Sequence, residues 1–210
     1  HNALDRAAMR EIRMVLADWA HADIRVLVLT GTGKSFCSGV SLDDVGHGDW
    51  SDNPLTAVCD ALENFHTPTV CALNGGAYGG GTELAMSCDF RIGVSGMKMF
   101  VPASKIGVHY EAAGLARFIE KLGSQTTRRI FLLGEISIGD DLLRNGFLDY
   151  LVENSGLETQ TDDLISKILE GAPMAVQGMK RTILEVSQNS LDAHDATNRV
   201  SECFASEDHA

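Results

Sequence analysis

Two glycine turns place free backbone N–H groups where an anion could bind. Ser38-Gly39-Val40 and Gly79-Gly80-Gly81 each follow an apolar run that predicts a buried strand. The second turn directly precedes a predicted helix, whose first N–H groups lack an intrahelical acceptor and carry the positive end of the helix dipole. Two converging amides of this kind form an oxyanion hole, which stabilises negative charge developing on a carbonyl oxygen.

Glu83 follows the second turn closely, in the first turn of the predicted helix. A carboxylate at this place can face whatever the amides bind and can transfer a proton. An acidic side chain in a first helical turn also favours the helix dipole without any catalytic role. Spacing alone leaves both interpretations open.

Other motifs in the sequence lack parts that their chemistry requires. Gly33-Lys34-Ser35 resembles the end of a phosphate-binding loop, but Val28 stands where the first glycine is needed and no helix start follows. Gly79-x-Gly81 lacks the third glycine of a dinucleotide fingerprint, because Leu84 stands at that position. The seven His show no pair at the spacing of metal ligands. We therefore predict no metal and no redox cofactor.

Composition predicts one ordinary globular domain. The chain has 210 residues, a formal charge of −12 and 44% hydrophobic residues, enough for a core without disulfides. The acidic balance argues against binding to nucleic acid or to an anionic membrane. The five Cys are isolated from one another, which fits a reducing compartment. With no long apolar run and no signal pattern, we expect a cytoplasmic protein.

The hydrophobic periodicity predicts strands alternating with helices, followed by helices alone. In the first half we predict a polar, irregular stretch over Ser41–Pro54, helices over Asp5–Trp19, Leu55–Phe65 and Thr82–Cys88, and strands over Ile24–Thr30, Thr69–Leu73, Asp89–Val94 and Met97–Val101. Beyond these we predict an edge strand over Phe147–Val152 and helices over Gly114–Leu122, Ser124–Leu133, Ile138–Arg144, Leu157–Gly171, Pro173–Gln188 and Leu191–Phe204. This order indicates an α/β unit of stacked turns with a helical C-terminal region.

Three stretches of sequence carry a family resemblance. They are His1-Asn2-Ala3-Leu4, V-L-V-L-T-G-T-G-K-S-F-C-S-G-V-S-L over residues 26–42, and P-T-V-C-A-L-N-G-G-A-Y-G-G-G-T-E-L-A-M-S-C-D-F-R-I over residues 68–92. Together they closely resemble the enoyl-CoA hydratase/isomerase, or crotonase, superfamily. Compared with that family, the sequence is expected to start just after the usual first strand and to stop before a final helix.

The resemblance implies a crotonase-like spiral of ββα units. Residues 1–150 would form the spiral core, and residues 151–210 a helical C-terminal region that assembles a homotrimer or hexamer. Such proteins bind acyl-CoA thioesters, so coenzyme A would enter as part of the substrate and not as a separate cofactor.

The resemblance also implies roles for individual residues. The amides of Val40 and Gly80 would hold the thioester oxygen, and Glu83 would transfer a proton. Ser38, Val40, Leu42, Gly79 and Gly80 would lie along the coenzyme A moiety; for Ser38, Val40 and Leu42 the alternative is turn formation and core packing.

The sequence departs from the family pattern at the position of a second catalytic glutamate, where it has Ala103. Glu111 is the closest carboxylate in sequence, but it lies eight residues further on and is interpreted as solvated. Ile106-Gly107-Val108-His109-Tyr110 instead resembles methylmalonyl-CoA decarboxylase-like members, which also lack that glutamate and place a tyrosine there. Tyr110, with His109, could then orient a carboxylate, or Tyr110 could be an ordinary half-buried aromatic residue.

These observations favour a lyase of the enoyl-CoA hydratase/isomerase type, acting in fatty acid metabolism through Glu83, Val40, Gly80 and Tyr110. Decarboxylation of a malonyl-type thioester and a catalytically silent acyl-CoA-binding protein are the alternatives. We expect the acyl pocket to involve the loop Val45–Asn53 together with Phe118 and Phe131.

Overall fold

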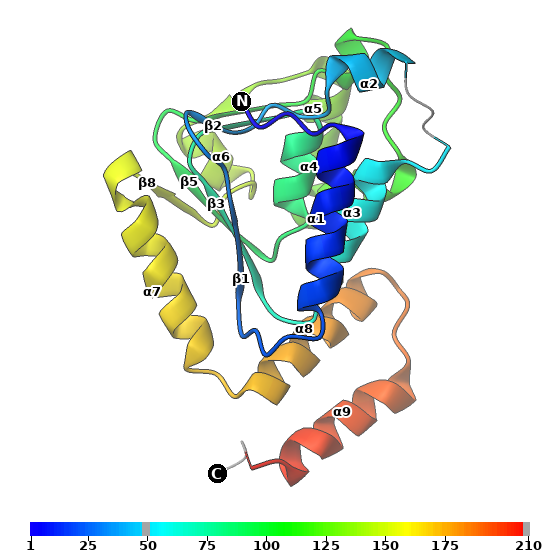
Figure 1. The fold of residues 1–210 in the computed structure, drawn as a ribbon, viewed down its shortest axis with the longest axis vertical. Coiled ribbons are helices and arrows are strands. Elements are labelled where there is room, and N and C mark those ends of the chain that lie inside the picture. The colour runs from blue at the N-terminus through cyan, green and yellow to red at the C-terminus, as the bar shows by residue number, and fades with distance from the viewer. Residues whose placement is uncertain (48–50, 208–210) are drawn as a thin grey trace.

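The chain forms repeated turns that add strands alternately to two sheets (Figure 1). The structure, a computed structural model, describes residues 1–47 and 51–207. One sheet is parallel, with the order β1 (Leu27–Thr30), β3 (Thr69–Leu73), β5 (Phe90–Val94) and β8 (Tyr150–Val152). The second has the order β2 (Ser35–Cys37), β4 (Gly76–Tyr78), β6 (Lys98–Phe100) and β7 (Ser137–Ile138), with β7 antiparallel to β6. Pairs of strands followed by a helix confirm the predicted ββα turns.

Helices connect and cover these sheets. The first half contains α1 (Arg6–Trp19), α2 (Leu42–His47), α3 (Pro54–Glu63) and α4 (Gly80–Met86). After the short 3-10 helix η1 (Ala103–Lys105) come α5 (Ala112–Leu133) and α6 (Asp140–Arg144). The chain ends with η2 (Asn154–Gly156), α7 (Leu157–Leu169), α8 (Pro173–Ser187) and α9 (Ala193–Ala205). None of these described helices has the length and apolar character needed to cross a membrane.

The central strand and the first helix agree with the sequence predictions. All five residues of β3 are buried, as expected for a strand between two parallel neighbours inside a sheet. Helix α1 is capped by Asp5, whose side chain accepts a hydrogen bond from the Ala8 N–H at 2.7 Å. Helix α5 changes direction at Gly123, where φ is 77°, so the two helices predicted on either side of this glycine are confirmed.

Three expectations for the first half were wrong. The strand predicted over Ile24–Thr30 begins only at Leu27, and Val28 and Thr30 are exposed because β1 is the edge of its sheet. The stretch predicted as irregular contains α2, which has two acidic residues in its first turn. Strands β2 and β4 were missed, since three residues are too few to show a period.

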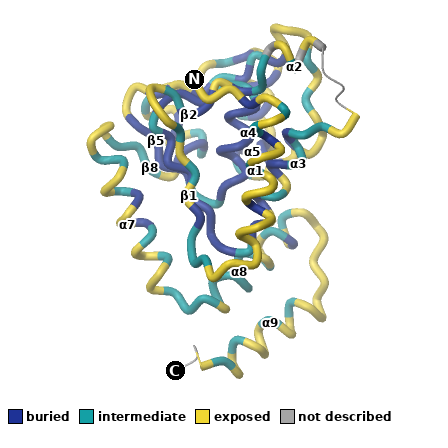
Figure 2. The backbone as a smooth tube through the Cα atoms, in the orientation of Figure 1, coloured by how far each residue is buried: buried dark blue, intermediate teal, exposed yellow. Residues whose placement is uncertain are grey.

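The helical C-terminal region was predicted correctly. Its last helix, α9, projects from the body of the molecule and packs on α8 (Figure 1). Burial is concentrated in β3, β5 and α4, whereas α9 contains no buried residue (Figure 2). All five cysteines are free thiols, and all but Cys203 are buried in the core.

The buried Arg91 and the half-buried Lys121 hold the C-terminal end of α4. The Arg91 guanidinium donates to the Phe147 carbonyl oxygen at 2.6 Å and to the Cys88 carbonyl oxygen at 2.9 Å. The Lys121 ammonium donates to the carbonyl oxygens of Met86 and Cys88. Positive charge at this end complements the helix dipole and fixes α4, whose other end carries Gly80 and Glu83.

Replacing Arg91 with methionine is expected to lower the free energy of unfolding by about 3 kcal/mol, because the Phe147 carbonyl oxygen loses its donor, the Cys88 carbonyl oxygen keeps only Lys121, and Asp149 loses its cation. Urea unfolding followed by circular dichroism measures this loss. Arg144→Met is the control: the Arg144 side chain is 69% exposed and pairs with Asp141 at the surface, so little change is expected. Equal effects of the two substitutions would contradict the role of Arg91.

Candidate active site

The first glycine turn is held in place by the N-terminal residues. The Asn2 side-chain amide donates to the carbonyl oxygens of Thr32, Ser35 and Phe36 at 3.0, 2.9 and 3.0 Å. Leu4 forms a parallel bridge to Val40, through the Gly39 carbonyl oxygen and the Ser41 N–H. In such a bridge the N–H of Val40 itself points away from Leu4. The Val40 amide is thereby directed to the side opposite Leu4.

The two glycine turns meet closely. A Cβ atom on Gly39, whose φ is +89°, would lie 3.3 Å from the Gly80 amide nitrogen and 2.6 Å from the Tyr78 carbonyl oxygen. A Cβ atom on Gly80 would lie 3.0 Å from the Val40 side chain. Only glycine allows this approach of backbone to backbone. The convergence of the two turns that the sequence predicted is therefore present.

The Gly80 amide has no acceptor within its own helix, because Gly80 is the first residue of α4. The preceding residue is tied down on both sides: the Gly79 N–H donates to the Phe100 carbonyl oxygen at 2.8 Å, and the Gly79 carbonyl oxygen accepts from the Thr82 N–H at 3.0 Å. Because the bridge to Leu4 does not use the Val40 N–H and the two turns lie close together, an acceptor oxygen between them could bind both amides.

A cavity of about 360 Å³ opens in front of these amides. Its apolar lining consists of Val40, Leu55, Val101, Pro102, Ala103, Ile106 and Val108, and its polar lining includes Ser38, Asn53, Tyr78, Glu83, His109, Tyr110 and Glu111. The predicted residues Ser38, Val40, Gly79, Gly80, Glu83 and Tyr110 are thus brought together around one space. Ala103 lines it too, so a methyl group occupies the position where the resemblance placed a second glutamate. Glu111 lines the cavity as an exposed residue.

Some predicted residues lie elsewhere. Leu42 begins α2, and its side chain is outside what the structure describes, as are residues 48–50 of the loop expected near the acyl pocket. Phe118 and Phe131 are buried behind Tyr110 and do not line the cavity. The ring of Phe131 meets those of Tyr110 and Phe118 edge-on, at centroid distances of 4.8 and 4.9 Å. Phe131 therefore supports the Tyr110 ring, and Phe118 in turn supports Phe131.

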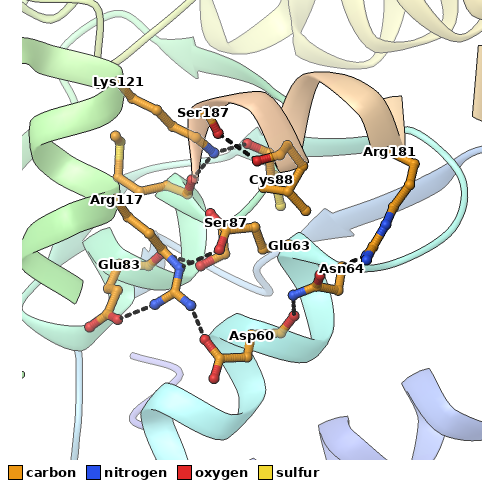
Figure 3. A network of polar contacts seen from close by, with 12 residues as sticks. Asp60, Glu63, Asn64, Glu83, Ser87, Cys88, Arg117, Lys121, Arg181 and Ser187 are labelled. Carbon is orange, nitrogen blue, oxygen red and sulfur yellow. Dashed lines mark hydrogen bonds and ion pairs between the residues drawn. The ribbon is translucent and has the colours of Figure 1, made fainter. Parts of the chain in front are cut away.

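Glu83 is almost completely buried, and it is paired with a cation. Its side chain is 2% exposed, and Oε1 accepts a hydrogen bond from Nη1 of Arg117 at 2.9 Å. The Arg117 side chain, 4% exposed, also donates from Nε to Oε2 of Glu63 at 3.1 Å and from Nη2 to Asp60. Figure 3 shows this guanidinium between the carboxylates of α3 and α4.

The surroundings of Glu83 favour proton transfer. Burial raises the pKa of Glu83, and the positive charge of Arg117 and a hydrogen bond with Tyr110 oppose that rise in part. Burial, together with the negative charge of Glu83, also raises the pKa of Tyr110, so its hydroxyl stays protonated. That hydroxyl also lies 3.4 Å from the Gly79 carbonyl oxygen, to which it donates. A carboxyl whose pKa is moved toward neutrality can both accept and release a proton.

Sequence reasoning missed Arg117, Glu63 and Asp60. A signal was present: Arg117 shares the buried face of α5 with Gly114, Phe118 and Leu122. A charged residue at such a position needs a buried partner of opposite charge.

Comparison with known proteins agrees with the resemblance seen in the sequence. The family model described as enoyl-CoA hydratase/isomerase matches residues 1–209. A short-chain-enoyl-CoA hydratase of Clostridium acetobutylicum is 28% identical, over 99% of this chain and 83% of that protein. A carnitinyl-CoA dehydratase of Proteus mirabilis is 26% identical, over 91% of this chain and 76% of that protein. The crystal structure of an enoyl-CoA hydratase from Bacillus anthracis superposes with a TM-score of 0.86 at 25% identity, over 99% of this chain and 83% of that one.

Paired strands, two converging glycine turns and a buried carboxylate beside them define an α/β protein of the crotonase fold. The chain belongs to the enoyl-CoA hydratase/isomerase family.

Gly114 lies against the candidate site, and substituting it is expected to destabilise the protein. A Cβ atom there would lie 2.9 Å from Oε1 of Glu83 and 2.9 Å from Cε1 of Tyr110. We expect Gly114→Ala to lower the free energy of unfolding by about 1 kcal/mol or more through overpacking. Gly178→Ala in α8 is the control, since its nearest neighbour would be at 3.9 Å, and it should gain about 0.5–1 kcal/mol from helix propensity. Urea unfolding measures the change in the free energy of unfolding for both variants, which should be negative for Gly114→Ala and positive for Gly178→Ala. An increase in both variants would contradict the close packing at Gly114.

Proposed function

We propose that this protein processes acyl-CoA thioesters by reactions of the hydratase/isomerase type, with the Val40 and Gly80 amides as oxyanion hole and Glu83 as proton-transfer residue. The observation that carries the proposal is the position of a buried carboxylate beside two converging backbone turns in one cavity. Family membership supports the thioester substrate.

The amides act on the thioester oxygen. Removing a proton from carbon next to a thioester, or adding a nucleophile to its double bond, moves negative charge onto that oxygen. Two preorganised N–H donors lower the energy of this enolate, and each is worth roughly 10²- to 10³-fold in rate. The apolar lining contributed by Val101, Pro102 and Val108 excludes water and so strengthens these hydrogen bonds.

Glu83 moves the proton. In isomerisation one carboxylate suffices, since it can take a proton from one carbon and return it to another. In hydration the same carboxylate would act on a bound water without the second glutamate that the resemblance led us to expect. Ala103 supplies no carboxylate to the cavity, and Glu111, which also lines it, is exposed. Glu83 is therefore the buried carboxylate among the described lining residues.

Glu83→Gln tests the proton-transfer role. We expect turnover of crotonyl-CoA to fall by about 10²-fold or more, because the amide keeps the shape but cannot accept a proton. Binding of the thioester, measured by calorimetry, should change little. Glu120→Gln, an exposed position on α5, is the control and should retain turnover. Unchanged turnover in Glu83→Gln would remove Glu83 from the mechanism.

Decarboxylation of a malonyl-type thioester is the second candidate function, and the position of Tyr110 favours it. The Tyr110 ring is packed against Phe131, and its protonated hydroxyl lies at the cavity next to Glu83. A donor there can orient a substrate carboxylate, whose loss again leaves an enolate for the two amides.

Mass spectrometry separates the two reactions. The protein is incubated separately with crotonyl-CoA and with methylmalonyl-CoA, and the products are followed for a gain of water or a loss of carbon dioxide. We expect water gain with crotonyl-CoA. Carbon dioxide loss that is abolished in Tyr110→Phe would instead establish the decarboxylase. Thioester binding with no turnover of any acyl-CoA, including no movement of the double bond in a 3-enoyl-CoA, would favour a silent acyl-CoA-binding protein.

A further inference from the structure

One buried cation serves three carboxylates behind the candidate site. Arg117 contacts Glu83 on α4 and both Glu63 and Asp60 on α3 (Figure 3). Arg117 and Glu63 do not line the cavity, whereas Glu83 does. Anything that Arg117 and Glu63 contribute to chemistry in the cavity must therefore pass through Glu83.

The cluster is short of positive charge. Glu63 is 7% exposed, and its Oε1 atom is buried without a hydrogen-bond partner among the described residues. The guanidinium is thus shared between two buried carboxylates, and the partly exposed Asp60 draws on it as well. Each carboxylate on α3 reduces the positive potential that Arg117 offers to Glu83.

We propose that Arg117 is a positioning residue that holds the Glu83 carboxylate at the cavity and sets its proton affinity, and that Glu63 tunes this affinity by sharing the guanidinium. The inference rests on the proposed role of Glu83 in proton transfer. It assigns neither Arg117 nor Glu63 any contact with the substrate.

Geometry limits what else can set the proton affinity of Glu83. Helix α5 and the segment before it present Arg117 and the Tyr110 hydroxyl, and α3 presents the Cys59 thiol and the Asp60 carboxylate. The Asp60 side chain is 53% exposed, and its negative charge also raises the pKa of Glu83. Burial keeps the Cys59 thiol protonated by raising its pKa. Arg117 and the two α3 carboxylates that share it, Glu63 and Asp60, are therefore the charges whose removal tests the proposal.

The proposal predicts shifts of opposite sign. Without the guanidinium, the charged form of Glu83 loses its cation and its pKa should rise. Without the Glu63 charge, the Arg117 guanidinium stabilises the charged form of Glu83 more strongly, and the pKa of Glu83 should fall. Damage to the fold alone would not move one group in opposite directions in two variants.

A carboxyl titration by nuclear magnetic resonance tests this directly. The full chain carries ¹³C at the glutamate carboxyl carbon, and the Glu83 signal is the one missing in Glu83→Gln. We expect its titration midpoint to move to higher pH in Arg117→Met and to lower pH in Glu63→Gln, with a downward shift in Asp60→Asn as well. Midpoints that are unchanged, or that move in the same direction in Arg117→Met and Glu63→Gln, would overturn the proposal.

Conservative variants keep the test decisive if Arg117→Met does not fold. Glu63→Gln preserves the shape and an oxygen acceptor for Arg117 Nε, and Arg117→Lys preserves the charge without the three-way contact. Arg117→Lys should leave the Glu83 midpoint close to that of the unmodified chain, while turnover of crotonyl-CoA falls by about tenfold because the carboxylate is less well oriented. Full turnover in Arg117→Lys would remove the positioning role.

The pH dependence of kcat links the two proposals and separates their failures. The limb of the kcat–pH profile that reports the ionisation of Glu83 should move to lower pH in Glu63→Gln and to higher pH in Arg117→Met, in step with the titration. If the titration shifts as expected but turnover survives in Glu83→Gln, the proposed function fails and the assignment of Arg117 stands. If Glu83→Gln is inactive but the titration does not shift, the assignment fails and the proposed function stands.

Discussion

A guanidinium buried among carboxylates from two other helices is the interaction around which this site is built. Arg117 lies within α5 and reaches back to α3 and α4, so one side chain fixes the relative positions of three helices. Taking a charge out of water is costly unless its partners are close and well oriented, and removing one partner leaves the other charge buried alone. The cluster therefore favours a single arrangement of these helices. In that arrangement a carboxylate is held at the wall of a cavity and not released to solvent.

The second constraint is the contact between two backbone segments. Gly39 lies so close to the backbone of the second turn that it leaves no room for a Cβ atom, and a Cβ atom on Gly80 would press on the Leu55 and Val40 side chains. The segments around both glycines are held by the Asn2 side chain and by the hydrogen bonds of Gly79. The glycine contact lies at the N-terminal end of α4, whereas Arg91 and Lys121 hold its C-terminal end. The Gly80 amide and the Glu83 carboxylate are thus both held by α4, which is fixed at its two ends. Preorganised electrostatic stabilisation requires donors and charges that are fixed in this way.

The features that could be predicted from sequence are those encoded locally. Strand β3 and helix α1 have clear periods, and α1 has its capping aspartate, so their bounds were close to the observed ones. The glycine turns were found because glycine marks close backbone approach, and Glu83 because it follows one of them. Strands β2 and β4 were not found, because three residues in a glycine-rich stretch carry no period.

Arg117 shows why the remainder was out of reach. An arginine in a helix usually lies at the surface, and its partners here are 34 to 57 residues away in the sequence. Only the folded chain brings those carboxylates to it. The same holds for Phe118 and Phe131, which were expected in the acyl pocket; instead Phe131 packs against Tyr110, and Phe118 packs against Phe131.

The distribution of cysteines gives this molecule a practical property. Cys37, Cys59, Cys71 and Cys88 are sealed in the interior, and burial raises the pKa of the first three, which keeps those thiols in their unreactive protonated form. Cys203 lies half-buried on α9, the helix that projects from the body. A thiol-directed fluorophore added to the unaltered sequence would therefore attach at one place, and its signal would report on the C-terminal helix without any engineered labelling site.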